Sequence, residues 1–177
     1  MRKLKLNELG RVSLEAYKAK KKHPIVFVLD NIRSHHNVGS SFRTADALGI
    51  EKLILSGITP KPPHREIQKT ALGATLSVEW LYEASIQDSL KQLKDEGYLI
   101  IAVEQTDSSV MLNDYQPSQD DKIALVFGNE VNGVTDEALK LADIALEIPQ
   151  YGTKHSFNIS VSLGIVGWDL LQKIKLL

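Results

Sequence analysis

The side chains that could take part in chemistry gather in four short polar segments, each directly after a run of apolar residues. These segments span residues 30–43, 104–107, 128–133 and 149–158. In an open α/β sheet, ligands bind beyond the carboxyl ends of the strands, where such segments lie. Polar and glycine residues therefore crowd one edge of the predicted sheet.

Familiar site chemistries fit these segments poorly. Four histidines lie near them, at positions 35, 36, 64 and 155. Neighbouring histidines cannot easily face one ion, and no carboxylate stands at a recognised ligand spacing, so no metal is expected. Ser156 follows His155, but the chain has no G-x-S-x-G elbow of a serine hydrolase. The absence of cysteine excludes thiolate zinc sites, disulfides and cysteine nucleophiles.

Nucleotide-binding fingerprints are also missing. The chain has neither G-x-G-x-x-G after its first strand nor G-x-x-x-x-G-K-[ST], which disfavours common dinucleotide and P-loop chemistry. Gly128 and Gly133 could let backbone approach a flat ligand, or they could serve a tight turn between strand and helix. Their spacing alone does not decide between these two roles.

Alternating apolar runs and helical patterns must position the polar segments. We predict buried strands at Ile25–Leu29, Lys52–Ser56, Tyr98–Val103, Ile123–Phe127 and Ile144–Ile148, with a weaker strand at Ser77–Tyr82. We predict helices at Val38–Leu48, Glu66–Leu72, Ile86–Glu96 and Thr135–Ala142. This order is typical of an α/β domain with a mostly parallel sheet and helices on both faces.

The last segment, Ser156–Leu177, has two periodicities. Its first half alternates as a strand does, and its second half repeats as a helix does, and we interpret the whole as a helix. Gly164 and Gly167 are poor helix formers, so close packing against another backbone is expected to compensate. Together with Trp168 and Leu171 they could form a dimer face, with burial inside one subunit as the alternative.

Length and composition favour one globular domain. The chain has 177 residues, of which 43% are hydrophobic and 24% charged. It has no apolar run of about 20 residues and no secretory h-region near its start, so we expect a cytoplasmic protein without membrane contact. Residues 1–22 hold eight Lys/Arg and two acids, against a net charge of −1 for the whole chain. This basic arm could bind a polyanion or simply remain solvated.

Three segments carry a more specific pattern. In Asn37–Gly49 an asparagine precedes an arginine by six residues; Leu125–Val134 contains Gly-Asn-Glu; Ile148–Gly152 is followed by Ser156-Phe157-Asn158. In content, order and separation these segments resemble the three motifs of the SpoU/TrmH class of RNA 2′-O-ribose methyltransferases, within the SPOUT superfamily. The resemblance covers about residues 24–175.

The resemblance implies properties that periodicity does not predict. They are a deep trefoil knot near the C-terminus, a homodimer, and S-adenosylmethionine bound in the knot. The domain with these properties is expected at residues 23–177, preceded by the basic arm at residues 1–22. Chains generally avoid knots, so the resemblance alone supports this topology. It implies cofactor binding by backbone of the knotted loops. The residues concerned are Val103, Glu104, Phe127, Gly128, Ile148, Ser156 and Phe157.

The resemblance also assigns catalytic positions. They are Arg43, Asn37, Glu130, Ser156 and Asn158. Arg43 takes the role of the base toward the ribose hydroxyl, but a guanidinium stays protonated in proteins, so electrostatic stabilisation of the alkoxide is the alternative. The polar residues have plainer interpretations: Asn37 as the N-cap of its helix, Ser156 and Asn158 as caps of the last helix, and Glu130 as a solvated acid.

We therefore expect transfer of a methyl group to a ribose 2′-hydroxyl of tRNA or rRNA. A silent RNA-binding module that keeps the cofactor pocket, or a base-methylating SPOUT enzyme, are the alternatives. RNA phosphates are expected to contact the arm and exposed cations near the cofactor edge, which position RNA without reading its sequence. The candidate cations are Arg33, Lys61, Arg65, Lys69 and Lys154.

Overall fold

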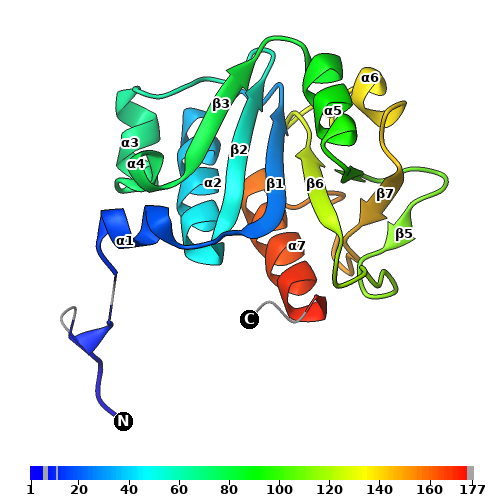
Figure 1. Ribbon diagram of the computed structural model, residues 1–177. Helices are drawn as coiled ribbons and strands as arrows, with labels where there is room; N and C mark the ends of the chain where they lie inside the picture. Colours follow the sequence, from blue (N-terminus) through cyan, green and yellow to red (C-terminus); the bar gives the residue numbers. More distant parts are fainter. Residues whose placement is uncertain (6–7, 11, 175–177) are drawn as a thin grey trace.

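A seven-stranded sheet runs through the computed structural model, which describes residues 1–5, 8–10 and 12–174 (Figure 1). The strands lie in the order β3-β2-β1-β6-β4-β7-β5, and every recorded pairing is parallel. Their bounds are β1 His23–Asp30, β2 Ile50–Ser56, β3 Glu79–Glu83, β4 Tyr98–Val103, β5 Val110–Met111, β6 Lys122–Phe127 and β7 Ile144–Glu147.

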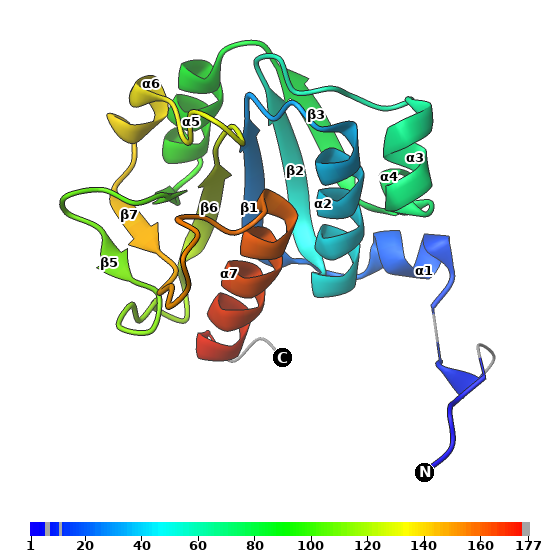
Figure 2. The ribbon, with the colours of Figure 1, turned by 180° about the vertical axis from the view of Figure 1, so that it is seen from behind.

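Helices cover both faces of the sheet (Figures 1 and 2). They are α1 Leu14–Ala19, α2 His35–Leu48, α3 Arg65–Ala71, α4 Ala74–Ser77, α5 Ile86–Asp95, α6 Asp136–Leu139 and α7 Ile159–Lys173. One face of the sheet packs against α2, α3, α4 and α7, and the other against α5 and α6. No described helix has both the length and the apolar character needed for a membrane span.

The alternation of β1 residues explains the two layers. Ile25, Phe27 and Leu29 belong to one apolar core, whereas Val26 and Val28 belong to the other. All five side chains are fully buried. Successive side chains of a strand point to opposite faces, so a continuous apolar run supplies both layers at once. The predicted α/β architecture with a parallel sheet is therefore confirmed.

Most predicted elements occur with shifted ends. The helix expected at 38–48 begins at His35, because Ser34 accepts a hydrogen bond from the Asn37 N–H and forms the N-cap. The interpretation of Asn37 as an N-cap is therefore wrong. The strand expected from Ser77 begins at Glu79, since Ser77 ends α4, and the helix expected at 135–142 forms only at Asp136–Leu139.

Three short elements were not expected, namely α1, α4 and β5. The first lies within the basic arm, where the Tyr17 hydroxyl donates to the Asp46 carbonyl of α2 at 2.9 Å. Burial and nearby Asp46 raise the pKa of Tyr17 to about 12. The second half of the arm thus packs on the domain, while Arg11 lies outside the described residues.

The C-terminal segment forms a helix, but it begins at Ile159 and not at Ser156, because Asn158 forms its N-cap. A Cβ at Gly167 would lie 2.9 Å from Leu48 Cδ1 and 3.0 Å from Phe27 Cζ, so a larger residue there would push against core side chains, whereas a Cβ at Gly164 would make only an ordinary contact at 3.9 Å. Leu171 is buried in the same core, whereas Trp168 is 55% exposed. Gly167 and Leu171 therefore serve packing within the subunit, and residues 175–177 of the predicted segment lie outside the described residues.

Candidate active site

A cavity of about 420 Å³ opens at the carboxyl edge of the sheet. It lies beyond the ends of β4, β6 and β7, and α7 with the segment before it closes its other side. This is the edge at which open α/β sheets bind ligands, and the volume is within the usual range for small-molecule sites. The polar segments after these three strands therefore meet at one place.

All seven predicted cofactor residues line this cavity. They are Val103, Glu104, Phe127, Gly128, Ile148, Ser156 and Phe157. Of the predicted catalytic residues, Glu130, Ser156 and Asn158 line it as well. The lining also includes side chains that the sequence analysis did not single out. They are Gln105, Asn129, Val131, Leu146, Glu147, Gln150, Ile159 and Ser162, and His155, which was considered only as a metal ligand, lines the cavity too.

Glu130 binds the beginning of α2. Its carboxylate accepts from the Arg33 N–H at 3.0 Å, the Ser34 N–H at 3.1 Å and the Asn37 side-chain amide at 2.9 Å. A carboxylate at a helix N-terminus satisfies free N–H groups and interacts well with the helix dipole. Glu130 is thus exposed to solvent, yet its carboxylate is bonded to the beginning of α2 at the cavity wall.

These contacts also set the charge of Glu130. Partial burial raises the pKa of its carboxyl, but the hydrogen bonds from Arg33, Asn37 and Ser34 outweigh burial and hold the pKa below its usual value. Glu130 is therefore ionised at neutral pH. A carboxylate so stabilised is a poor proton acceptor.

Asn158 links the third motif to the first. Its side-chain amide donates to Asn37 Oδ1 at 3.1 Å, and its own Oδ1 accepts from the Ser160 N–H at 2.9 Å. Asn158 therefore caps α7 and contacts Asn37 at the same time, so its two interpretations are compatible. One chain of hydrogen bonds, Asn158 to Asn37 to Glu130, joins the three motif segments across 121 residues of sequence.

The glycines after β6 are required by the loop itself. A Cβ at Gly128 would lie 2.0 Å from the Gly133 carbonyl carbon and from the Val134 nitrogen. Gly133 has φ +69°, and a Cβ there would lie 2.2 Å from Glu104 Oε2. Both glycines thus serve the tight turn, and both also line the cavity, so the two roles that their spacing left open are compatible.

Glu104 holds the same loop from β4. Its Oε2 accepts from the Val134 N–H at 2.9 Å, and its Oε1 accepts from the Gln105 N–H at 2.8 Å. Both carboxylate oxygens are therefore bonded to backbone. Glu104 shapes the cavity wall by fixing where residues 128–134 run.

Sequence reasoning missed two buried polar residues that connect the loops. Asp30 is fully buried, and its Oδ2 accepts from the Thr135 N–H and hydroxyl, each at 2.8 Å. Asn129 donates from its side chain to the Asn31 carbonyl at 2.7 Å. Asp30 ends an otherwise apolar strand, and a charged residue at such a position was a sequence feature that could have indicated this role.

Arg43 stands apart from the cavity lining. It lies exposed on α2, two turns beyond Asn37 and outside the set of lining residues. Within the described ranges it makes no hydrogen bond or ion pair with another side chain. No cluster of three or more histidines and carboxylates in this part of the chain could hold a metal ion.

Comparison with known proteins agrees with this geometry. Residues 24–168 match the SpoU rRNA Methylase family. The chain is 32% identical over 143 residues to the 23S rRNA (guanosine-2′-O-)-methyltransferase RlmB of Neisseria meningitidis, which covers 81% of this chain and 56% of that protein. It is 30% identical over 151 residues to the tRNA (guanosine(18)-2′-O)-methyltransferase of Borreliella burgdorferi, and this match covers 85% of this chain and 67% of that protein.

Solved structures share the fold. The A. aeolicus TrmH/SpoU tRNA modifying enzyme superposes with a TM-score of 0.79 at 25% identity, over 92% of this chain and 80% of that one. The AdoMet-bound rRNA methyltransferase from Sinorhizobium meliloti superposes with a TM-score of 0.78 at 26% identity, over 86% of this chain and 57% of that one. The chain thus spans little more than half the length of some relatives. It belongs to the SpoU rRNA methylase family.

Proposed function

We propose that this chain is an S-adenosylmethionine-dependent RNA methyltransferase that modifies a ribose 2′-hydroxyl of tRNA or rRNA. The observation that carries the proposal is the hydrogen-bonded chain Asn158–Asn37–Glu130, which unites three motif segments at the rim of one cavity. The two curated relatives reported above are named as 2′-O-methyltransferases, one for rRNA and one for tRNA.

The cavity suits the cofactor chemically. Val103, Phe127, Ile148 and Phe157 offer an apolar surface for an adenine ring. Glu104, Glu130 and Glu147 add negative charge, which favours a ligand that carries a sulfonium and an ammonium group. The related structure from Sinorhizobium meliloti is described as AdoMet-bound. When bound, the cofactor would supply an activated methyl group to the ribose oxygen and leave as S-adenosylhomocysteine, while the 2′-hydroxyl proton passes to solvent water.

The chain's own residues align the hydroxyl and stabilise its negative charge. Glu130 and Asn158 fix Asn37 at the first turn of α2, and Arg43 extends from the same helix. Arg43 carries a permanent positive charge and so stabilises the alkoxide that forms as the proton leaves. Because Glu130 is held ionised by its hydrogen bonds, it orients Asn37 and does not take the proton.

The proposal includes a homodimer. Val161 and Trp168 lie seven residues apart on one side of α7 and are 46% and 55% exposed, while Tyr151 before this helix is 97% exposed. An unpartnered apolar stripe on a long helix is typical of an interface. Sedimentation at micromolar concentration should give twice 19.7 kDa, and a monomer would contradict the dimer. The trefoil knot and the cytoplasmic location stay predictions.

The test uses labelled S-adenosylmethionine with unmodified tRNA and rRNA, followed by digestion to nucleosides. Label in a 2′-O-methyl nucleoside supports the proposal and identifies the substrate class. Label in a base-methylated nucleoside contradicts it in favour of a base methyltransferase. Cofactor binding without label in any RNA contradicts it in favour of a silent RNA-binding module.

A further inference from the structure

Three exposed cations lie in α3 and in the loop before it, and α3 packs on the side of α2 opposite the cavity. We define the α3 surface as Lys61, Arg65 and Lys69, which belong to the β2–α3 loop and to α3. We propose that the α3 surface binds the phosphate backbone of the RNA strand whose ribose reaches the cavity. This inference rests on the proposed function and adds to it which side of the protein contacts the RNA.

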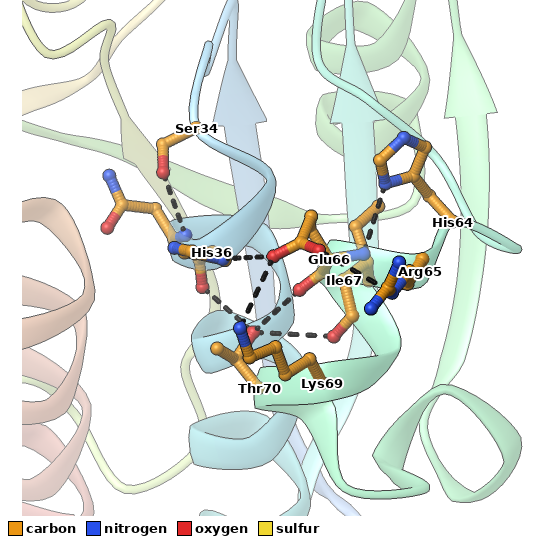
Figure 3. Close-up of polar contacts among 9 residues, drawn as sticks. Ser34, His36, His64, Arg65, Glu66, Ile67, Lys69 and Thr70 are labelled. Carbon is orange, nitrogen blue, oxygen red and sulfur yellow. Dashed lines mark hydrogen bonds and ion pairs between the residues drawn. The ribbon is translucent and has the colours of Figure 1, made fainter.

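The first turn of α2 connects this surface to the cavity. His36 Nε2 lies 2.7 Å from Glu66 Oε2 of α3, as Figure 3 shows. The next residue, Asn37, donates instead to Glu130 of the cavity wall. Consecutive residues thus contact α3 on one side of α2 and the cavity on the other. An α-helix with side chains is about 10–12 Å across, so one RNA strand can span both places.

Close packing fixes α3 on α2. A Cβ at Gly39 would lie 2.0 Å from Thr70 Oγ1 and 2.3 Å from the Ile67 carbonyl oxygen, so the two helices touch backbone to backbone. The Thr70 hydroxyl donates to the His36 carbonyl at 3.1 Å (Figure 3). Arg65 and Lys69 therefore project from a helix that cannot shift relative to the cavity, which lowers the entropic cost of binding.

The loop that carries Lys61 is held equally firmly. The buried Thr59 hydroxyl donates to the Leu29 carbonyl and accepts from the Ile32 N–H, each at 3.0 Å. The Tyr82 hydroxyl donates to the Gly57 carbonyl at 3.0 Å, and Lys61 Nζ lies 3.9 Å from the centre of the Tyr82 ring. The ammonium group thus stays near the surface of β3 and exposed to solvent.

The charges of the α3 surface are available to a ligand. The Arg65 side chain is 93% exposed and the Lys69 side chain 69% exposed. Glu66, the acid between them, is bonded to His36, and that hydrogen bond lowers the pKa of Glu66 (Figure 3). Lys69 Nζ lies 3.8 Å and Arg65 Nε 4.0 Å from the Glu66 carboxylate, and exposed ion pairs of this kind are weak. Phosphate groups can therefore replace these contacts.

A polyanion with evenly spaced negative charges is complementary to this group of cations. The chain as a whole has a net charge of −1, yet on the α3 surface Arg65 and Lys69 flank a single acid, and Lys61 adds a third cation in the preceding loop. Lysine and arginine bound to phosphates position a nucleic acid without reading its sequence. A strand whose phosphates repeat evenly can contact several of these cations while its target ribose lies beyond α2.

The test measures binding of an unmodified tRNA transcript to the intact protein across a range of salt concentrations. Arg65→Gln/Lys69→Gln should weaken binding about tenfold at low salt and reduce the slope of log K against log salt by about 1 to 2. The matched control, Lys91→Gln/Lys140→Gln, removes two exposed cations from α5 and the end of α6, on the opposite face of the sheet. It should leave both values unchanged.

Equal weakening in both variants overturns the proposal, because general charge would then explain binding. An unchanged affinity and slope in the α3 variant also overturn it. So does a poly-glutamate chain that competes as well as RNA, because the surface would then fit an acidic protein. Since RNA binding is measured without methyl transfer, a wild type that binds through α3 but forms no 2′-O-methyl nucleoside contradicts the proposed function and leaves this surface standing.

Discussion

The two edges of the sheet use charged side chains in different ways. At the amino edge, Lys52 Nζ lies 3.6 Å from Glu96, Lys122 donates to the Glu96 carbonyl at 2.6 Å, and Tyr98 donates to Glu51 at 2.8 Å. At the carboxyl edge, carboxylates accept mainly from backbone N–H groups. The first arrangement mainly joins side chains to one another, with Lys122 as the exception that bonds to a backbone carbonyl, whereas the second fixes where loops run.

This difference separates stability from function. Ion pairs between side chains on a surface adjust easily and contribute little each. Carboxylates bonded to N–H groups hold backbone in one conformation, which a preorganised site requires. We therefore expect changes at the carboxyl edge to affect cofactor binding and methyl transfer, and changes at the amino edge to affect unfolding alone.

The largest effect is expected for Gly128→Val. The new side chain would overlap backbone at Gly133 and Val134, so the loop that lines the cavity must move. S-adenosylmethionine binding, measured by calorimetry, should weaken at least about 100-fold, or about 2.7 kcal/mol. Gly152→Ala is the matched control, since a Cβ there meets nothing within 4 Å. Equal affinities for the two variants would contradict the role of the 128–134 loop.

Arg43→Ala separates chemistry from cofactor binding. Arg43 lies outside the cavity lining, so the affinity for S-adenosylmethionine should stay within twofold of wild type. The single-turnover rate of methyl transfer should fall about 100-fold, as when one group that stabilises an oxyanion is removed. Arg43→Lys tests the base hypothesis: a rate that is merely lower, with an unshifted pH profile, supports electrostatic stabilisation. A full-rate Arg43→Ala enzyme would refute both roles.

Glu130→Gln should reveal the bonded carboxylate through the pH dependence of stability. The folded pKa of Glu130 lies below its usual value of 4.5, so its contribution is present above pH 4.5 and is lost as the pH falls through the folded value. Urea unfolding should show about 1 kcal/mol lost at pH 7 and less below pH 4.5. Glu137→Gln, an exposed change in α6, is the control. A pH-independent loss would contradict this account.

Tyr98→Phe should have the smallest effect on function. Burial and the hydrogen bond to Glu51 raise the pKa of Tyr98, so its hydroxyl remains a donor at neutral pH. Removing that donor should lower the free energy of unfolding by about 1 kcal/mol. The methyl-transfer rate should change less than twofold. A loss of rate as large as that of Arg43→Ala would remove the distinction between the two edges.

The layers of the fold were predictable because strands that are buried on both faces are continuously apolar in sequence. The apolar runs at 25–29 and 98–103 favour strands covered on both sides because they are too short for typical helices, and their order predicts parallel pairing. The two-residue strand Val110–Met111 is not part of a comparable apolar run, and both of its side chains are exposed, so nothing in its sequence indicates a strand. The start of α2 was misplaced because Ser34 and Asn37 are equally good caps by residue type.

The site was predictable as a set of residues and less so as an arrangement. Motif resemblance selected Asn37, Glu130 and Asn158, yet nothing in their spacing shows that they bond to one another. That contact depends on the sheet order, which brings distant segments to one edge. Asp30 and Asn129 were missed for the same reason, because their partners are backbone groups that lie close only after folding.

The most direct test of the account is a double-mutant cycle on the methyl-transfer rate, with the product identified as a 2′-O-methyl nucleoside. Asn37→Ala and Asn158→Ser each break the amide contact, and serine preserves the cap of α7. Each change should slow transfer about tenfold. Because the residues act as one hydrogen-bonded unit, the double variant should be scarcely slower than either single variant. Losses that multiply to about 100-fold would show that the motifs act independently and contradict the account.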